Sequence, residues 1–453
     1  MAELTIIEYT ELAIWDVKNH FRLQNIFKEK LPLVLFGEFL SKPIIEKTKI
    51  IDHKEYRILG VRSYGKGTFI NRTVKGNTLK MRTYQIAPKD HLFWCKVDTK
   101  NGAFGIIDDR FEKGIASSNM TFATIDKSKV LIDYVQLLFK SPMVNQYMDG
   151  FVTGSTNRKY IKPDQLLNEI KIPLPSINEQ KRIIDNYNYH FDIAENQENE
   201  ITQLENEIEK ILFKDLGLDK IDNKVSKVGL SFVSYTEIAE WGYNIDNSRF
   251  QSNIYKTTSL SISPELFNDA FRGKSPKYDS EGNSTILNQK CNRWNALDLS
   301  YVKTVNDKWY NKIDKKFFTR EGDVLINSTG DGTIGRASII TFENEDLLYD
   351  SHLLLLRLDK TKVNPLFFTY LFNSKYGQYQ VESIKSAQST KQTELGITNL
   401  KKIIFPLPSI QLQNTIANKL QSIYQRIEIL KVNALNNRKD ALVKFEQEIF
   451  SQK

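Results

Sequence analysis

The 453-residue sequence is poor in cysteine and contains no long apolar run. Its two cysteines, Cys95 and Cys291, lie far apart, which excludes a disulfide framework and a cysteine-rich zinc site. No stretch approaches the roughly 18 apolar residues of a membrane helix. The first residues also lack a basic segment leading into an apolar one. We therefore expect a cytoplasmic protein with no secretory signal and no membrane partner.

Signatures of catalysis are missing as well. The five histidines are scattered, and none has a metal-ligand spacing to another histidine or a cysteine. Neither G-x-S-x-G nor H-E-x-x-H occurs. The Asn-Pro-Pro-aromatic signature of adenine methyltransferases is also absent. We predict no catalytic residue, no metal site and no cofactor bound by this chain.

Two glycine-rich segments come close to nucleotide-binding motifs. Residues 60–67 have the G-x-x-x-x-G-K spacing of a P-loop, but Gly67 stands where magnesium binding requires Ser or Thr. Residues 330–335 fit G-x-G-x-x-G, yet a strand pattern follows them, whereas a dinucleotide site needs a helix there. We predict tight turns at both places. Exposed glycines beside Lys66 or Arg336 would still let the backbone approach a nucleic-acid phosphate.

The net charge of +8 is unevenly distributed. Residues 42–90 carry twelve Lys/Arg and four Asp/Glu, and residues 289–320 carry eight and three. Residues 179–219 are acidic, with four Lys/Arg and eleven Asp/Glu. Both basic blocks also contain aromatic residues, a mixture that suits a phosphate-facing surface. The alternative interpretation is a solvated sheet face with lysine stems lying along it.

The chain repeats itself with a period near 230 residues. Pro-Leu-Pro-Ser-Ile at 173–177 recurs at 406–410, an offset of 233 that also pairs Gln180 with Gln413. Near the start, Tyr-Thr-Glu at 9–11 recurs at 235–237, an offset of 226. Several matches in the same order indicate a tandem duplication with loop-length changes inside one shared fold. The period is far too long for a solenoid, so we predict two similar domains.

Each half begins with short runs rich in β-branched and aromatic residues and continues with a helical apolar pattern. The expected strands are Tyr56–Val61, Thr83–Ile86, Leu92–Val97, Asp323–Ile326, Ser338–Phe342 and Leu353–Leu358, and the expected helices are Val130–Phe139 and Leu366–Phe372. This predicts a mixed α/β (α+β) fold in which two tandem domains with β-rich mixed sheets are each followed by a long helix. The boundaries are a first domain at 1–170, its helix at 171–222, a second domain at 223–403 and its helix at 404–453.

Each Pro-Leu-Pro-Ser segment predicts the start of a long helix, because Ser176 and Ser409 are natural N-caps. Glu179 completes a capping box in the first copy only. Apolar residues then follow a heptad pattern over four or more heptads, as in a coiled coil. Polar residues interrupt the seam at His190 and Gln197 in the first helix and at Asn437 and Lys444 in the second. The apolar seam residues are Ile183, Tyr187, Ile201, Leu204 and Ile208 in the first helix and Ile416, Leu420, Ile423, Ile427 and Leu430 in the second.

The two predicted helices carry opposite net charge. The first lies in the acidic block, whereas residues 411–453 hold seven Lys/Arg and four Asp/Glu. Opposite charge favours pairing of the two helices with each other over self-pairing of either one. The alternative is that each helix packs only on its own domain.

Two basic globular domains in tandem, each followed by Pro-Leu-Pro-Ser and a long helix, resemble the specificity subunit of type I restriction–modification systems. The resemblance covers essentially the whole chain. The second helix start departs from the family's usual Glu-Gln-Lys by having Leu412-Gln413-Asn414. The segments that carry the resemblance are 172–183, 405–413, 154–158 and 332–336.

The resemblance implies that each globular part is a target-recognition domain that reads one half of a bipartite, asymmetric DNA sequence. The two helices would pair antiparallel as a spacer, with Pro173, Pro175, Pro406 and Pro408 at their starts. Two modification subunits would dock on this chain and methylate adenine with S-adenosylmethionine. Restriction subunits would add translocation and cleavage that depend on ATP and Mg. The chain itself would supply recognition and assembly, with no catalysis of its own.

In such a protein, Lys and Arg contact phosphates, whereas Arg, Asn and Gln read base edges. The candidate DNA-binding residues are Arg62, Lys66, Arg72, Arg82, Asn157 and Arg158 in the first domain and Arg293, Lys303, Lys308, Arg336, Gln388 and Lys391 in the second. Three other functions stay open at this point. The chain could be a DNA-recognition subunit of a different bacterial defence or methylation system, a nuclease with an unrecognised site, or a coiled-coil adaptor that binds only protein.

Overall fold

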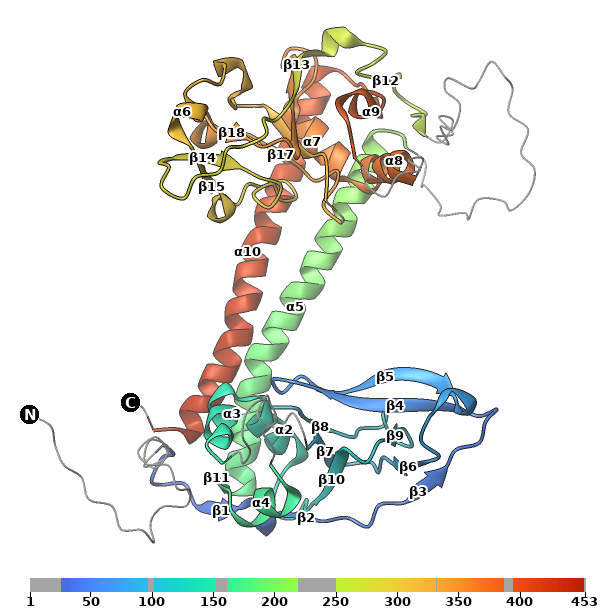
Figure 1. Cartoon of the computed structure of the whole chain (residues 1–453), viewed down its shortest axis with the longest axis vertical. Helices are drawn as coiled ribbons and strands as arrows, with labels where there is room; N and C mark the ends of the chain where they lie inside the picture. Colours follow the sequence, from blue (N-terminus) through green and yellow to red (C-terminus); the bar gives the residue numbers. More distant parts are fainter. Residues whose placement is uncertain are drawn as a thin grey trace, which may run out of the picture. The chain divides into compact units, whose positions relative to one another are not determined.

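The computed structural model describes residues 26–96, 102–151, 161–218, 250–330, 332–386 and 394–451. The chain forms two compact units, whose elements are labelled in Figure 1. Unit 1 comprises the chain up to Glu198 together with Lys431–Lys453, and unit 2 is the continuous segment Asn199–Leu430. Each unit therefore includes part of both long helices.

Unit 1 has sheets in the orders β1-β11, β2-β10-β7-β8 and β3-β6-β9-β4-β5. Its strands are β1 (Leu33–Leu35), β2 (Leu40–Ser41), β3 (Lys47–Lys49), β4 (Glu55–Arg62), β5 (Gly67–Lys75), β6 (Thr83–Ile86), β7 (His91–Cys95), β8 (Phe104–Ile106), β9 (Ile115–Ala116), β10 (Met120–Ile125) and β11 (Lys171–Pro173). Its short helices are α2 (Ile132–Lys140), α3 (Pro142–Asp149) and α4 (Pro163–Asn168).

Unit 2 has sheets in the orders β12-β20, β13-β19-β16-β17 and β15-β14-β18. Its strands are β12 (Thr257–Ser259), β13 (Phe267–Arg272), β14 (Ser284–Leu287), β15 (Lys303–Val305), β16 (Val324–Asn327), β17 (Ala337–Ile339), β18 (Leu348–Tyr349), β19 (Leu353–Leu358) and β20 (Ile404–Pro406). Its short helices are α6 (Asp307–Tyr310), α7 (Pro365–Asn373), α8 (Lys375–Ser386) and α9 (Ile397–Lys401).

The sheets of unit 2 repeat most of those of unit 1, although β3 and β6 have no counterpart among the described strands of unit 2. The order β2-β10-β7-β8 recurs as β13-β19-β16-β17. The parallel pair β4–β9 recurs as β14–β18, and β5 and β15 are the antiparallel neighbours of β4 and β14. From β7 and β16 onward, equivalent elements differ by 233 in residue number. The predicted fold class, with tandem mixed α/β domains that are each followed by a long helix, is confirmed.

The expected elements agree closely with the observed ones. Thr83–Ile86 and Leu353–Leu358 are strands with those limits, and the two expected short helices correspond to α2 and α7. The strand expected at Ser338–Phe342 instead ends at Ile339, because a 3₁₀ turn begins at Phe342. Val97, expected to end a strand, lies outside the described residues, as do the repeated segments at 9–11 and 235–237.

Strand β19 shows why the core of unit 2 is so apolar. All six of its residues are buried. Successive side chains point to opposite faces of a sheet, and a separate apolar cluster covers each face: Leu354 and Leu356 belong to one, Leu353 and Leu355 to the other. The one charged residue, Arg357, is compensated by ion pairs to Asp323 (2.8 Å) and Asp269 (3.2 Å).

A buried glutamine closes the start of each long helix. The Gln180 side chain accepts from the Leu131 N–H (2.8 Å) and donates to the carbonyls of Lys129 (3.1 Å) and Pro175 (2.8 Å). Gln413 makes the same three bonds at the equivalent positions, to the Asn364 N–H (2.9 Å) and the carbonyls of Lys362 (3.0 Å) and Pro408 (2.9 Å). Neither glutamine is exposed to solvent. Each therefore ties its long helix to the N-terminus of α2 or α7.

Helices α5 (Ile177–Asp215) and α10 (Ile410–Ile449) pair antiparallel within each unit. In unit 1, Arg182 pairs with Glu448 (2.9 Å) and Glu198 with Arg438 (2.6 Å). In unit 2, Glu200 pairs with Arg426 (3.0 Å). The predicted antiparallel pairing of the two helices is confirmed. The predicted capping box is present as well, since the Glu179 N–H donates to Ser176 Oγ (3.3 Å).

The polar residues that interrupt the two seams face each other in unit 1. Gln197 accepts from Asn437 (3.1 Å), and Lys444 Nζ lies 2.7 Å from His190 Nε2. Each polar break in one helix is therefore matched by a break in the other, so that it finds a hydrogen-bond partner inside the seam. Such pairs favour one register over its alternatives, because a shifted register would bury a polar group against an apolar one.

Each unit is also closed by the C-terminal end of the helix that begins in the other unit. In unit 1, Lys28 N donates to Ile449 O at the end of α10 (3.1 Å). In unit 2, Asn253 N donates to Gly217 O just after α5 (2.8 Å). Carboxylates of the same helix ends cap the helices that follow α2 and α7. Glu446 accepts from the Met143 N–H (2.9 Å) and Glu209 from the Lys375 N–H (3.0 Å).

The glutamine bonds yield a stability prediction. Gln413→Ala leaves the Asn364 N–H and two carbonyls without their partner, so we expect the free energy of unfolding to fall by roughly 1–3 kcal/mol. Urea denaturation of the full chain measures the change. Gln411→Ala, at an exposed position of the same helical turn, is the control and should change stability little. Equal effects of the two substitutions would show that the buried bonds do not stabilise the fold.

Candidate nucleic-acid interface

The candidate interface lies where the two repeats differ. Strands β4 and β5 of unit 1 are joined by a turn at residues 63–66, whereas the equivalent strands β14 and β15 of unit 2 are joined by residues 288–302. Most of the described candidate DNA-binding residues lie on or beside these connections. They are Arg62, Lys66 and Arg72 in unit 1 and Arg293, Lys303 and Lys308 in unit 2.

In unit 1 the candidates lie on the long β4–β5 hairpin, drawn as the extended blue strands of Figure 1. Arg72 is the register partner of Ile58, and Arg62 follows Ile58 by four residues on the same strand. Both arginines therefore project from one face of the hairpin. The Arg62 guanidinium lies over the Phe69 ring, 4.9 Å from its centroid. The β4–β5 hairpin thus carries two exposed cations on a common face.

The remaining unit 1 candidates are also exposed. Lys66 lies in the β4–β5 turn, where positive φ angles at Tyr64, Gly65 and Gly67 reverse the chain. The predicted tight turn is confirmed, and strand β5 follows it directly. Arg82 forms an exposed ion pair with Asp52 (2.6 Å), an interaction that a phosphate can replace at little cost.

The unit 2 connection is long but firmly anchored. Asn292 is fully buried, and its amide donates to the carbonyls of Leu325 (3.2 Å) and Arg336 (2.9 Å) and to the side chain of Asn327 (3.0 Å). Its own oxygen accepts from Ser338 Oγ (2.5 Å). The Asn292 side chain therefore fixes the connection to strands β16 and β17 through both its amide nitrogen and its oxygen.

The residues next to this anchor bring cations onto aromatic rings. Arg293 lies over Tyr301 (4.8 Å) and Arg336 over Trp294 (5.8 Å). Asp298 lies 3.7 Å from Arg293. The pKa of Asp298 is lowered, chiefly by the hydrogen bond from the Ser300 hydroxyl and in smaller part by Arg293. Arg293 thus has a solvent-facing guanidinium with a carboxylate nearby.

A glycine turn adjoins this group. Gly330, Gly332 and Gly335 all have positive φ, and strand β17 follows, so the predicted turn in place of a dinucleotide site is confirmed. Arg336 donates to Gly332 O (3.2 Å). Thr329 Oγ1 lies 2.6 Å from His352 Nδ1 at the edge of the turn. The Arg336 side chain thus supports the turn from inside.

Two further candidates lie farther along the chain. Lys303, at the start of β15, lies over the Tyr278 ring (4.7 Å), and Lys308 is exposed on α6.

Burial raises the pKa of Asp350 in the same unit, whereas the hydrogen bond that Asp350 accepts from the His352 N–H acts to lower it. Four of the sequence-predicted residues, Asn157, Arg158, Gln388 and Lys391, lie outside the described residues.

The spacer residues pack inside this chain. Pro173 and Pro406, at the helix starts, lie in strands β11 and β20, which pair with β1 and β12. The carbonyls of Pro175 and Pro408 accept hydrogen bonds from Gln180 and Gln413. In unit 1 the buried seam residues are Ile183 and Tyr187; in unit 2 they are Ile208, Ile416, Leu420, Ile427 and Leu430, with Ile201, Leu204 and Ile423 partly buried against the same core.

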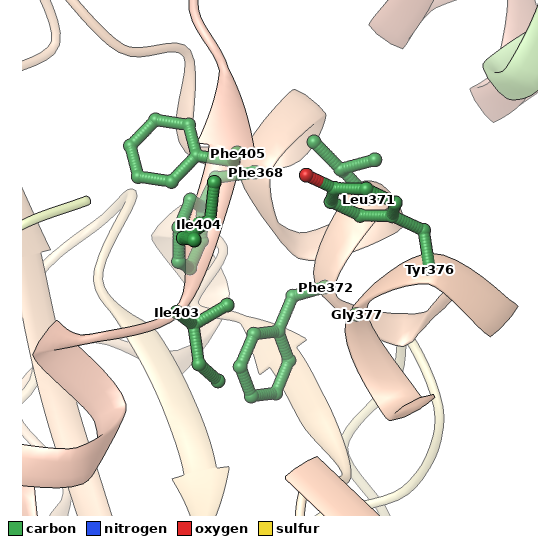
Figure 2. Close-up of a pocket in the computed structure, with 8 residues that line it drawn as sticks. All are labelled: Phe368, Leu371, Phe372, Tyr376, Gly377, Ile403, Ile404 and Phe405. Atoms are coloured by element: carbon green, nitrogen blue, oxygen red, sulfur yellow. The ribbon is translucent and has the colours of Figure 1, made fainter. Parts of the chain in front are cut away.

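A small apolar pocket lies between α7, α8 and β20, and its one ionisable side chain, Tyr376, donates to Phe250 O (2.8 Å) (Figure 2). The pocket is therefore a gap in the core of unit 2. Within the described ranges, no three His, Cys, Asp or Glu side chains gather as a metal site. In the same ranges, no helix has the length and apolar character needed to cross a bilayer.

Residues 278–437 match the family model described as the type I restriction modification DNA specificity domain. The match contains the anchored connection, the glycine turn and the second buried glutamine. This part of the chain therefore resembles the DNA specificity domain of type I restriction–modification systems.

A curated relative in this family, the putative type I restriction enzyme MjaX specificity subunit of Methanocaldococcus jannaschii, is 28% identical over 137 residues. That alignment covers 29% of this chain and about a third of the relative's length (32%).

Two solved structures of type I restriction–modification proteins are similar to this chain, and the first shares its fold. A chain in a study of complex assembly and conformational transition of the type I R-M system matches with a TM-score of 0.53 and 14% identity over 93% of this chain and 99% of that chain. The S subunit from M. genitalium matches with a TM-score of 0.45 and 16% identity over 94% of this chain and 98% of that chain.

Sequence reasoning missed the residues that position the candidates. Phe69 and Tyr301 were visible only as aromatics within basic blocks, and nothing in the sequence linked each of them to one arginine. The run of asparagines at 288, 292 and 295 was the available signal for an anchored loop, because asparagine side chains often bond to nearby backbone.

The anchor gives a direct test. Asn292→Ala removes the bonds that hold residues 288–302 to the sheet, so we expect rapid proteolytic cleavage within this connection and a lower melting temperature. Limited proteolysis followed by mass spectrometry locates the cleavage. Asn311→Ala, at an exposed position of the same unit, should leave the cleavage pattern unchanged. A protected connection in the Asn292 variant would contradict its role as the anchor.

Proposed function

We propose that this chain is the DNA-recognition subunit of a type I restriction–modification complex and reads a bipartite, asymmetric target. The observation that carries the proposal is the contrast between the repeated frame and its unequal connections. Equivalent strands are joined by residues 63–66 in unit 1 and by residues 288–302 in unit 2. A shared frame with different exposed side chains suits two related recognition events on two different half-sites.

The charges and polar groups at these connections support a nucleic-acid partner. Arg62, Lys66 and Arg72 are exposed on one hairpin, and Arg293, Lys303 and Lys308 are distributed around the other. Such cations contribute salt-dependent affinity by displacing counterions from phosphates. Side chains with planar hydrogen-bonding groups then discriminate among base edges in the groove.

In this proposal the paired helices serve as the spacer between the half-sites and as the docking surface for two modification subunits. A helix of 39 residues is about 58 Å long. Adenine methylation with S-adenosylmethionine, and ATP- and Mg-dependent translocation and cleavage, belong to the modification and restriction subunits. This chain then contributes recognition and assembly in the cytoplasm, and binds none of these cofactors.

The test is co-expression with a modification subunit of the same genome, followed by single-molecule mapping of methylated adenines. Methylation at one interrupted, asymmetric motif is the expected result. Absence of any motif, while the purified chain still binds DNA in a salt-dependent manner, would contradict the type I assignment. Metal-dependent DNA cleavage by the purified chain alone would contradict the non-catalytic role.

The spacer role predicts a change in target geometry. Insertion of one heptad into α5 after Glu198 and one into α10 after Leu430 lengthens both helices by about 10 Å, which corresponds to roughly 3 base pairs of B-DNA. We expect the gap between the half-sites to grow by that amount while both half-sites stay the same. Methylome mapping of the variant measures the gap. An unchanged gap with full methylation would refute the spacer role.

A further inference from the structure

Two arginines lie near corresponding connections of the two repeats. Arg62 is the last residue of β4, and Phe69 lies on β5. Arg293 lies in the connection that follows β14, the equivalent of β4, and Tyr301 lies just before β15, the equivalent of β5. The guanidinium carbons are 4.9 Å and 4.8 Å from the respective ring centroids. Both repeats thus place one arginine on an aromatic ring at or near the connection between these two strands.

Other stacked arginines use some of their donors on groups within the chain. Arg110 lies over Phe111, but its Nε and Nη2 donate to Asp108 at 3.0 Å and 2.5 Å. Arg438 lies over Phe191, but it donates to both carboxylate oxygens of Glu198. Arg336 uses one donor on Gly332 O, and its Nε is buried. Each of these three arginines thus has part of its donor edge directed at a group within the chain.

Arg62 and Arg293 differ from them in this respect. Within the described ranges, the Arg62 side chain has no hydrogen bond or ion pair, and it is exposed. Arg293 forms one long ion pair, to Asp298 at 3.7 Å, and 38% of its side chain is exposed. The ring beneath each guanidinium limits its conformations while the donor edge stays open to solvent. Both side chains are therefore arranged for a ligand that accepts two parallel hydrogen bonds.

A glycine makes room for the aromatic ring on which Arg62 lies. A Cβ on Gly60 would lie 2.9 Å from the nearest carbon of the Phe69 ring. The absence of a side chain at Gly60 therefore lets the ring lie across the strand, where it supports Arg62. Any larger residue at this position would displace the ring and, with it, the guanidinium.

A guanidinium edge fits the O6 and N7 acceptors of guanine in the major groove, and a lysine ammonium lacks this planar pair of donors. We propose that Arg62 and Arg293 are the base-reading side chains of the two units and that each recognises one guanine, Arg62 in one half-site and Arg293 in the other. This inference rests on the proposed DNA-recognition function and specifies which residues perform it. It also predicts that both half-sites contain a guanine whose replacement is poorly tolerated.

The test is a selection from a duplex library with the full chain bound to its modification subunits, comparing wild type with Arg62→Lys and Arg293→Lys. Lysine keeps the charge, so binding to non-specific DNA and its salt dependence should stay within about twofold. Each variant should lose the preference for guanine at a single position, in a different half-site for each variant. The expected loss is roughly 5- to 150-fold, the discrimination of one bidentate contact.

Three further variants sharpen the interpretation. Phe69→Leu removes the ring under Arg62 and should weaken the same guanine preference to a smaller extent than Arg62→Lys. Arg110→Lys, a stacked arginine with occupied donors, and Arg320→Lys, an exposed arginine of unit 2, are the matched controls and should leave every base preference unchanged.

The outcomes separate this inference from the function on which it rests. A wild-type complex without any sequence preference would overturn the proposed function itself. A wild-type motif that both lysine variants leave intact would overturn only the assignment of the two arginines. Equal loss of binding to all sequences would identify phosphate contacts, and a changed preference at a position other than guanine would refute the guanine assignment.

Discussion

The hydrogen bonds of two buried glutamines hold the repeated frame together. A polar side chain without solvent access is costly unless its donors and acceptor are used. Gln180 and Gln413 meet this condition by bonding the start of a long helix to the start of a short one and to the proline segment between. Because α5 and α10 complete both cores, this local geometry decides how each helix leaves its own unit.

In the proposed function, recognition falls to the segments in which the two repeats differ. Both cores are built from equivalent strands and helices, whereas the connection after β4 and β14 differs in length and in the residues it exposes. Asn292 compensates for the longer connection by fixing it to the sheet. An interface that is firmly anchored loses less conformational freedom on binding, and more of its contact energy then remains for discrimination.

Periodicity and repetition predicted much of this fold from the amino-acid sequence. The strand at Leu353–Leu358, the helices α2 and α7 and the apolar seam all follow from local patterns. The matching of Gln197 with Asn437 and of His190 with Lys444 did not, because it depends on a register between segments some 240 residues apart. For the same reason, basic blocks located the candidate interface in general, but which arginine has a free donor edge emerges only from side-chain contacts.

The division of the chain between the units has a consequence for synthesis. Ala441, Phe445, Ile449 and Phe450 belong to the core of unit 1, although most of that unit is encoded far upstream. Unit 2 is one continuous segment, and all of its core residues precede these residues in the chain. The part made first therefore finishes folding last. Until α10 emerges, unit 1 exposes an apolar groove in the nascent chain, a state in which chaperone binding would matter most.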